Sequence, residues 1–364
     1  MTNHFNNIYK NRRVLVTGHT GFKGSWLCAW LNKLGADVTG YALAPPTQPN
    51  HYECLNLDIN SVINDIRDYE ALLNVFKEFK PEIIFHLAAQ PSVLVSYKDP
   101  IETISTNVIG TAHVLEASRQ INNVTAVVIV TTDKCYDNKE WLYGYRENDD
   151  LGGHDLYSAS KACAEIVTAS YRRSFFSSKQ SDNHKLLVAS ARAGNVIGGG
   201  DWTDERLVPD VFRAVAQSNS VKVRNPDSTR PWQHVLEPLS GYLLLGQKLL
   251  QGLSDFADAW NFGPDLESNM KTVEIIDMMA NEWSAITAKT LIDNNAPHEA
   301  GLLMLDSTKA KVQMNWEPVW GIKNTVNKTV NWYKNYIEKD IAITLEQIDD
   351  YTTDAIRNKK TWSN

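Results

Sequence analysis

Short apolar runs alternate with longer amphipathic stretches along the first half of the chain. Continuous apolar runs of this length are typical of strands buried on both faces. Apolar residues at helical spacing fill the stretches between them. The pattern predicts strands at residues 13–17, 37–43, 82–87, 126–131 and 186–192, and helices at 25–34, 68–80, 103–120 and 157–176.

Strands that alternate with helices form βαβ units, and these build a mainly parallel sheet. We therefore expect an α/β fold of the Rossmann type, a doubly wound parallel sheet, over residues 1–193. Beyond this point the elements become shorter, which predicts a smaller C-terminal α/β domain for the substrate over residues 194–364. A helix is expected at 235–251, and the chain is expected to return to the first domain near 235–265. The polar tail after Asp340 has no assigned role.

A glycine-rich loop separates the first strand from the first helix. Gly18, Gly21 and Gly24 follow a G-x-x-G-x-x-G spacing, and the residues between them include Thr20, Phe22 and Lys23. Gly18 permits a tight turn, Gly21 lets a diphosphate approach the backbone, and Gly24 lets the helix pack closely on the strand. Free N–H groups at the helix N-terminus would face the phosphates. The loop predicts a dinucleotide site, with a plain glycine-rich turn as the alternative.

The expected dinucleotide is NAD, but the acid that usually selects it is missing. Such an acid normally ends the second strand and binds the adenosine ribose, whereas residues 40–43 read Gly-Tyr-Ala-Leu. NADP therefore stays open, with Lys23 as a candidate ligand of its 2′-phosphate. Candidate neighbours of the adenosine follow later strands, with ordinary loop polarity as the alternative: Asp65, Ile66, Ala88, Ala89 and Gln90.

Tyr157 and Lys161 are one helical turn apart and share a helix face. No other Tyr-x-x-x-Lys occurs in the sequence. A cation beside a phenol favours the phenolate and lowers its pKa. We therefore expect Tyr157 to accept a proton from a sugar hydroxyl, and Lys161 also to hold the nicotinamide ribose. A solvated surface pair is the alternative.

Thr132, Asp133 and Lys134 follow the strand at 126–131 and add an acid and an amine to this set. With the glycine loop, the turn at 88–90 and the Tyr-x-x-x-Lys pair, the chain resembles the extended short-chain dehydrogenase/reductase family over nearly its whole length. The sugar-nucleotide 4,6-dehydratases of that family carry Thr-Asp-Glu here. Lys134 in place of Glu, together with residues 21–27 and 230–235, is similar to the CDP-glucose 4,6-dehydratases.

The resemblance implies a lyase that acts on CDP-glucose through a transient oxidation. Tyr157 would deprotonate the 4-hydroxyl as hydride leaves C4 for the cofactor, with Thr132 hydrogen-bonded to the same oxygen. Asp133 would protonate the departing 6-hydroxyl and Lys134 would take the C5 proton. Hydride would then return to C6 and leave a 4-keto-6-deoxy sugar. Burial would favour the neutral forms of Asp133 and Lys134, so the two would share one proton.

The last strand of the first domain ends beside candidate ligands of the nucleotide. The resemblance implies that Asn195 contacts the phosphates, with Arg192 beside it. Arg230 can bind a diphosphate through two parallel hydrogen bonds, with a structural ion pair as the alternative. Further candidates on the substrate side, each with a packing role as the alternative, are Trp202, Trp232 and His234.

Composition excludes several other classes of partner. The chain of 364 residues has a net charge of −7 and no basic stripe, so nucleic acid is not expected. No apolar run could span a bilayer and the start at 1–13 has no h-region, which predicts a cytoplasmic protein without a membrane partner. The cysteine and histidine spacings predict no metal. The family resemblance implies a homodimer or a dimer of dimers through helices 103–120 and 157–176.

Two other functions fit the same scaffold. A sugar-nucleotide 4-epimerase or reductase needs no elimination across C5–C6, so Asp133 and Lys134 argue against it. A non-catalytic dinucleotide sensor would not need the Tyr157/Lys161 pair. The sequence therefore favours a dehydratase.

Overall fold

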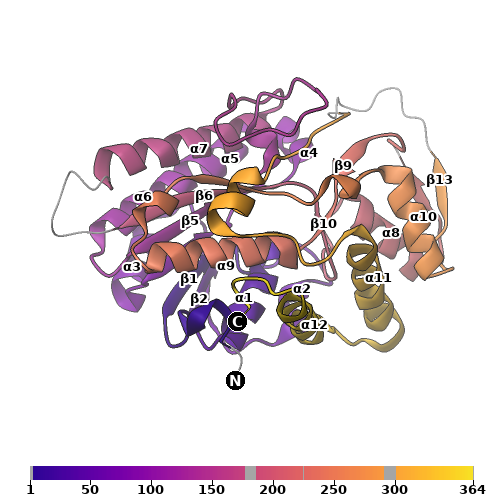
Figure 1. The fold of residues 1–364 in the computed structure, drawn as a ribbon, viewed down its shortest axis with the longest axis horizontal. Helices are drawn as coiled ribbons and strands as arrows, with labels where there is room; N and C mark the ends of the chain where they lie inside the picture. Colours follow the sequence, from indigo (N-terminus) through magenta and orange to yellow (C-terminus); the bar gives the residue numbers. More distant parts are fainter. Residues whose placement is uncertain (1–2, 177–185, 224, 291–300, 364) are drawn as a thin grey trace.

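The computed structural model describes residues 3–176, 186–223, 225–290 and 301–363. Two residues of the polar start and the last residue of the tail lie outside them. Figure 1 shows one large sheet with helices on both of its faces and a group of smaller elements beside one end of it.

The large sheet has seven strands in the order β11-β6-β5-β4-β1-β2-β3. Every neighbouring pair in it is parallel, which confirms the predicted doubly wound α/β fold. Its strands are β1 (Arg13–Thr17), β2 (Asp37–Ala42), β3 (Asn60–Ile63), β4 (Ile83–His86), β5 (Ala126–Val130), β6 (Leu187–Ala193) and β11 (Ala259–Phe262). The predicted strands are confirmed to within a residue or two, whereas β3 and β11 were not predicted as strands. Two of the four residues of β3 are polar and three are exposed.

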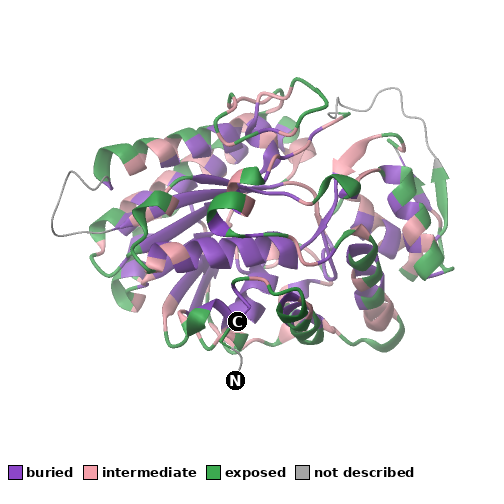
Figure 2. Ribbon diagram, in the orientation of Figure 1, coloured by how far each residue is buried: buried purple, intermediate pink, exposed green. Residues whose placement is uncertain are grey.

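The two faces of the sheet bury two separate cores. Val14 and Val16 of β1 point into one core and Leu15 into the other, as the alternation of a strand requires. Figure 2 shows both layers buried against the sheet. The first core is covered by α1 (Phe22–Lys33), α9 (Leu236–Leu250) and α12 (Thr344–Arg357), and the second by α3 (Tyr69–Phe79), α6 (Gly110–Gln120) and α7 (Leu156–Phe175).

The predicted helix at 103–120 is built from three pieces. It runs as α5 (Pro100–Ile104), a π-helical segment at Ser105–Ile109 and then α6. The short α4 (Val93–Lys98) precedes it and α2 (His51–Leu55) follows β2, and the sequence predicted neither. Other short helical turns lie at His4–Asn7, Asp133–Cys135, Ser254–Phe256, Leu266–Ser268 and Ala310–Met314.

The second half of the chain adds small sheets and then rejoins the large one. Its two-stranded sheets pair β7 (Val196–Ile197) with β10 (Gln233–His234), β9 (Thr229–Pro231) with β12 (Asn269–Lys271), and β8 (Val221–Val223) with β13 (Ala288–Thr290). The helices α8 (Leu207–Ala216), α10 (Thr272–Glu282) and α11 (Ile322–Lys339) accompany them. Between these elements α9 packs on the large sheet, and β11 pairs in parallel with β6.

The tail after Asp340 is part of the first core. It forms α12, and beyond that helix Trp362 is 2% exposed. The indole of Trp362 stacks on Phe5 with ring centroids 5.0 Å apart, and it also contacts Trp30 and Tyr351. The tail therefore joins the N-terminal segment to α1. No helix in the described ranges is long and apolar enough to cross a membrane.

Candidate active site

The glycine loop lies where β1 ends, beside the first residues after β4. Gly18 has φ +77°, and a Cβ there would lie 2.7 Å from the Ala88 nitrogen. A Cβ on Gly24 would lie 2.0 Å from the Gly18 oxygen, so both positions require glycine. Gly21 is the N-cap of α1 and offers no side chain to cap it. The first N–H groups of α1 are therefore available to an anion at the point between β1 and β4 where the strand order reverses.

Lys23 lies on the catalytic side of this loop. Burial lowers its pKa to about 8, the Arg206 and Lys161 charges lower it too, and Asp133 and Asp201 oppose them. These groups follow β5, lie on α7 or lie in the segment 201–206 before α8, and not at the end of β2, where a 2′-phosphate would lie. This placement favours a role for Lys23 beside the catalytic groups over contact with a 2′-phosphate.

The expected cofactor ligands after β1 and β3 are largely engaged in local contacts. The Thr20 hydroxyl donates to the Leu43 oxygen at 2.9 Å. The Asp65 carboxylate accepts from the Arg67 guanidinium at 2.5 Å, and Arg67 holds its pKa below the usual range. Ile66 is buried in the second core. Asp65 can still meet a ribose, because its side chain is partly exposed.

The turn after β4 is fixed by hydrogen bonds. The Ala88 nitrogen donates to the Thr17 hydroxyl at 3.2 Å, and the Gln90 nitrogen donates to Asn107 Oδ1 at 2.8 Å. Ala89 is half-buried between them. Because the turn lies against Gly18, these residues border the glycine loop.

The catalytic turn begins directly after β5. Thr132 is the N-cap of the turn Asp133–Cys135, and its hydroxyl accepts from the Lys134 nitrogen at 3.3 Å. The same hydroxyl donates to Asp133 Oδ1 at 3.0 Å. β5 ends at Val130, so the turn lies beyond the carboxyl end of the sheet and its side chains are freed from strand alternation.

One carboxyl oxygen of Asp133 is buried and makes no hydrogen bond within the described residues. The residue is 2% exposed, and its Oδ2 has no hydrogen-bond partner within the described chain. Burial raises the pKa of Asp133, while the nearby charges of Lys134, Arg230 and Lys23 oppose this. A carboxyl group in this position favours the protonated, donating form more than an exposed aspartate does.

Tyr157 and Lys161 are buried in the first turns of the long helix α7. Asp155 caps this helix by accepting from the Ser158 nitrogen at 2.9 Å. Burial raises the pKa of Tyr157 to about 12, opposed by a hydrogen bond with Thr132 and by the Arg206 charge. Burial also lowers the pKa of Lys161 to about 8. The pKa of Tyr157 is therefore raised, not lowered as expected from Lys161, and the contributions that oppose the rise come from Thr132 and Arg206.

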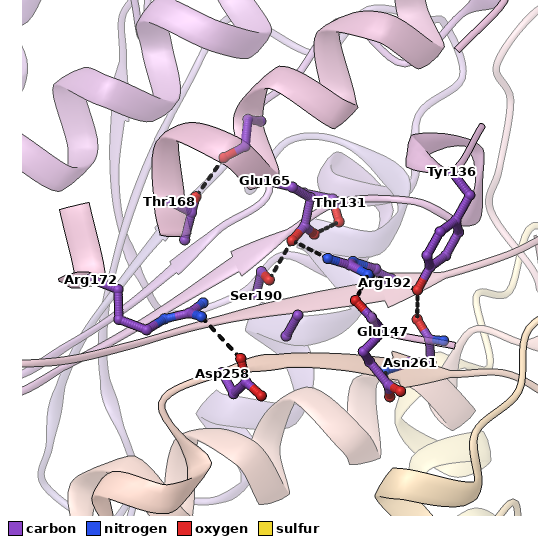
Figure 3. A network of polar contacts seen from close by, with 12 residues as sticks. Thr131, Tyr136, Glu147, Glu165, Thr168, Arg172, Ser190, Arg192, Asp258 and Asn261 are labelled. Atoms are coloured by element: carbon purple, nitrogen blue, oxygen red, sulfur yellow. Dashed lines mark hydrogen bonds and ion pairs between the residues drawn. The ribbon is translucent and has the colours of Figure 1, made fainter. Parts of the chain in front are cut away.

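Three expected substrate ligands turn out to be packed inside the protein. Arg192 is 3% exposed and pairs with Glu165 (Figure 3). Trp232 is 4% exposed and donates to the Met270 oxygen at 3.0 Å. His234 is fully buried, with its ring against Trp26 and Trp320. Each of the three has a packing or ion-pair role instead of an open face toward a ligand.

Asn195 and Arg230 remain near the pocket. Asn195 is half-buried directly after β6, and its backbone oxygen accepts from Gln233 at 3.1 Å. Arg230 is half-buried in β9, and its charge acts on Asp133. The guanidinium also donates to the Gly301 oxygen at 3.2 Å.

Arg206 is a site residue that the sequence did not reveal. It immediately precedes α8, its guanidinium lies 3.1 Å from Asp201, and its charge acts on both Tyr157 and Lys23. The missed signal was the apolar spacing of α8, whose buried residues Val208, Val211 and Phe212 mark a helix that begins at this arginine. Within the described ranges no three acidic, histidine or cysteine side chains gather as a metal site would need.

The comparison with known proteins is decisive at the level of the family. The model of a family described as GDP-mannose 4,6 dehydratase matches residues 15–329. The chain belongs to this family. Its expected place in the extended short-chain dehydrogenase/reductase family is confirmed.

Individual relatives and structures show the same fold. The chain is 50% identical over 356 residues to a CDP-glucose 4,6-dehydratase of Salmonella typhimurium. The matched residues cover 96% of this chain and 99% of that protein. It is 28% identical to a UDP-glucose 4-epimerase of Mycolicibacterium smegmatis, over 89% of this chain and 99% of that one. A dTDP-glucose 4,6-dehydratase from Bacillus anthracis, solved in complex with NAD, superposes with a TM-score of 0.74 at 21% identity, over 90% of this chain and 98% of that one.

Proposed function

We propose that the chain is an NAD-dependent hydro-lyase that converts CDP-glucose to CDP-4-keto-6-deoxyglucose. The observation that carries this is the set formed by Thr132, Asp133 and Tyr157. The Thr132 hydroxyl is bonded to Asp133 and interacts with Tyr157, so an acid and a phenol lie close to each other. The high identity to a CDP-glucose 4,6-dehydratase supports the same substrate.

The glycine loop fits a dinucleotide. A diphosphate would meet the uncapped N-terminus of α1 at Gly21, and the turns that require glycine at 18 and 24 keep side chains out of its path. When bound, NAD supplies the acceptor for hydride from C4 and the donor that returns it to C6. In this proposal Lys161 holds the nicotinamide ribose and Asp65 the adenosine ribose.

The protein's own groups divide the proton transfers among them. Tyr157 accepts the proton of the 4-hydroxyl, while Thr132 orients that oxygen. Lys134 takes the proton from C5, which the 4-ketone has made acidic. Asp133 donates from its unpartnered oxygen to the departing 6-hydroxyl, and its raised pKa keeps a proton available for that step.

Arg230, Asn195 and Arg206 form the substrate side of the pocket in this proposal. Two guanidinium groups whose charges act on Asp133 and Tyr157 suit the two negative charges of a nucleoside diphosphate. Arg206 also lies close enough to stabilise the phenolate of Tyr157. Arg192, Trp232 and His234 are left out of substrate binding.

The test is turnover on CDP-glucose with a catalytic amount of NAD, followed by mass analysis of the product. Loss of one water without net formation of reduced nicotinamide supports the dehydratase. Net reduction indicates a dehydrogenase, a 4-epimer of unchanged mass indicates an epimerase, and no reaction leaves the dinucleotide sensor. Matched reactions with dTDP-glucose and GDP-glucose establish the base preference, and reactions with NADP establish that of the cofactor.

Assembly and location complete the proposal. Exposed apolar side chains on α5 to α7, such as Ile101, Ile109 and Ile166, form a face suited to a second copy. Leu115 of α6 is not part of this face, because it is buried in the second core. We propose a homodimer or a dimer of dimers in the cytoplasm, with the cofactor domain ending at 193 and the substrate domain following it. Light scattering of the purified chain tests the assembly.

A further inference from the structure

Behind the catalytic turn lies a buried ion pair that none of these roles uses. Arg192 Nη2 is 2.8 Å from Glu165 Oε2, and each side chain is 3% exposed. Glu165 also accepts from the hydroxyls of Thr131 at 2.5 Å and Ser190 at 2.7 Å (Figure 3). Burial would raise the pKa of Glu165, but the Arg192 charge and these donors hold it below its usual range, so the pair is ionised.

The pair holds the chain on both sides of the catalytic turn. Thr131 directly precedes Thr132 and donates to Glu165. Tyr136 directly follows the turn, and its hydroxyl accepts from Arg192 Nη1 at 2.7 Å while its ring lies 5.0 Å from the guanidinium carbon. Residues 132–135 are therefore spanned by two side chains that are fixed on one ion pair.

The same pair also joins this turn to the helix of the phenol. Glu165 is one turn after Lys161 on α7, and its charge raises the lysine pKa against the effect of burial. On the other side, the Tyr136 hydroxyl donates to Asn261 of β11 at 2.8 Å. The ion pair is thus the point where α7, the ends of β5 and β6, and β11 meet (Figure 3).

We propose that Glu165 and Arg192 are positioning residues that set the distance between the acid–amine turn at 132–134 and the helix of Tyr157. The inference rests on the proposed function, in which oxidation at C4 and elimination across C5–C6 act on one bound hexose. A displacement of about 1 Å can cost roughly 100-fold in rate. A buried ion pair brings little net stability over apolar residues, so stability alone does not account for contacts concentrated on the two residues that flank the turn.

Isosteric removal of the two tethers tests this proposal. Thr131→Val and Tyr136→Phe each delete one hydroxyl and leave the ion pair itself in place. In single turnovers with CDP-glucose and NAD, the reduction of nicotinamide should keep a rate within about 3-fold of that of the parent protein. Its reoxidation, which waits for the elimination, should slow by about 10- to 100-fold. Reduced nicotinamide should therefore accumulate, and exchange of solvent deuterium into C5 should slow with the same rate constant.

Matched controls remove equally buried hydroxyls elsewhere. Thr168→Val acts on the same helix, where the hydroxyl donates to the Ala164 oxygen at 2.7 Å, and Tyr9→Phe removes a bond of 2.5 Å to the Leu243 oxygen. The inference is overturned if the tether variants behave like these controls, or if reduction and reoxidation slow equally. If the parent protein releases no dehydrated product from CDP-glucose, the proposed function fails and the inference falls with it; the parent reaction thus separates the two failures.

Discussion

The unpartnered oxygen of Asp133 lies against the backbone of Gly194, where a Cβ would come within 2.6 Å of it. The same Cβ would lie 3.1 Å from Pro231 Cγ, so it could not move aside freely. Gly194 directly follows β6, and Asp133 follows the neighbouring β5. The place of the acid in the pocket therefore depends on the absence of a side chain at the end of the next strand.

Gly194→Ala should displace the Asp133 carboxyl and slow the elimination. A shift of several tenths of an ångström to 1 Å in a catalytic group corresponds to a loss of roughly 10- to 100-fold in kcat. The measurement is steady-state turnover of CDP-glucose together with the fraction of enzyme-bound nicotinamide in the reduced form, which should rise. Gly321→Ala is the control, because nothing lies within 4 Å of its Cβ. An alanine at 194 that leaves kcat unchanged would show that the carboxyl is not held by this contact.

Lys23→Met should alter the pH profile of the reaction without altering the choice of cofactor. The Lys23 charge lowers the pKa of Asp133, so its removal raises that pKa further. Because Asp133 works in its protonated form, the alkaline limb of kcat should move to higher pH. The preference for NAD over NADP should stay the same, since Lys23 lies with the catalytic groups.

A lysine at the other end of α1 provides the control for this variant. Lys33 pairs with Asp349 at 2.7 Å on the surface, and Lys33→Met should leave the pH profile where it was. Selective loss of NADP binding in Lys23→Met would restore the 2′-phosphate role that the structure argues against.

Local patterns in the sequence were sufficient to predict the sheet and the catalytic set. Five strands of the large sheet are short, mostly apolar runs, and the residues of the catalytic turn and of α7 carry their spacing in the sequence itself. Arg192 could not be assigned in the same way. Its partner Glu165 lies 27 positions away, and the pairing exists only because α7 packs against β6. A guanidinium on a strand end predicts a ligand contact and a buried ion pair equally well until the packing is known.

The tail and the start of α8 were missed for a similar reason. Ile348, Tyr351 and Trp362 are separated by polar residues, and their common partner is the first core, which the N-terminal half builds. Arg206 and Tyr157 belong to different halves of the chain, and only the packing of the two halves brings them near each other. Such long-range relationships are set by tertiary packing and leave little trace in local periodicity.

Stability should fall between about pH 5 and pH 7 because of Glu237. Its carboxylate is fully buried in α9, accepting from the Val319 and Trp320 nitrogens and from the Tyr351 hydroxyl. Burial raises its pKa to about 7, well above the unfolded value. A raised carboxyl pKa contributes stability that is full below the unfolded pKa and is lost as pH rises through the folded pKa. The loss amounts to about 3 kcal/mol in order of magnitude.

Glu237→Gln removes the titration and therefore this pH dependence. Denaturant unfolding at several pH values gives the gap in the free energy of unfolding, parent protein minus variant. This gap should decrease as the pH rises from 5 to 8. The control is Glu317→Gln, at an exposed carboxylate paired with Lys360, for which the gap should stay constant. A constant gap for Glu237→Gln as well would mean that Glu237 is ionised in the folded protein throughout this range.

Trp362→Ala should destabilise the whole fold although it lies two residues from the end of the chain. The indole is 2% exposed and stacks between Phe5 and Tyr351, and the Phe5 nitrogen donates to the Trp362 oxygen at 2.7 Å. Removal of a buried tryptophan side chain costs about 3–5 kcal/mol. The free energy of unfolding in guanidinium should fall by that amount, while kcat of the folded fraction should stay unchanged, because the rings that Trp362 contacts are those of Phe5, Trp30 and Tyr351 and not residues of the catalytic turn. Trp141→Ala, at an indole 41% exposed, should cost less than about 1 kcal/mol. An equal, small effect for both tryptophans would mean that the tail rests on the core without stabilising it.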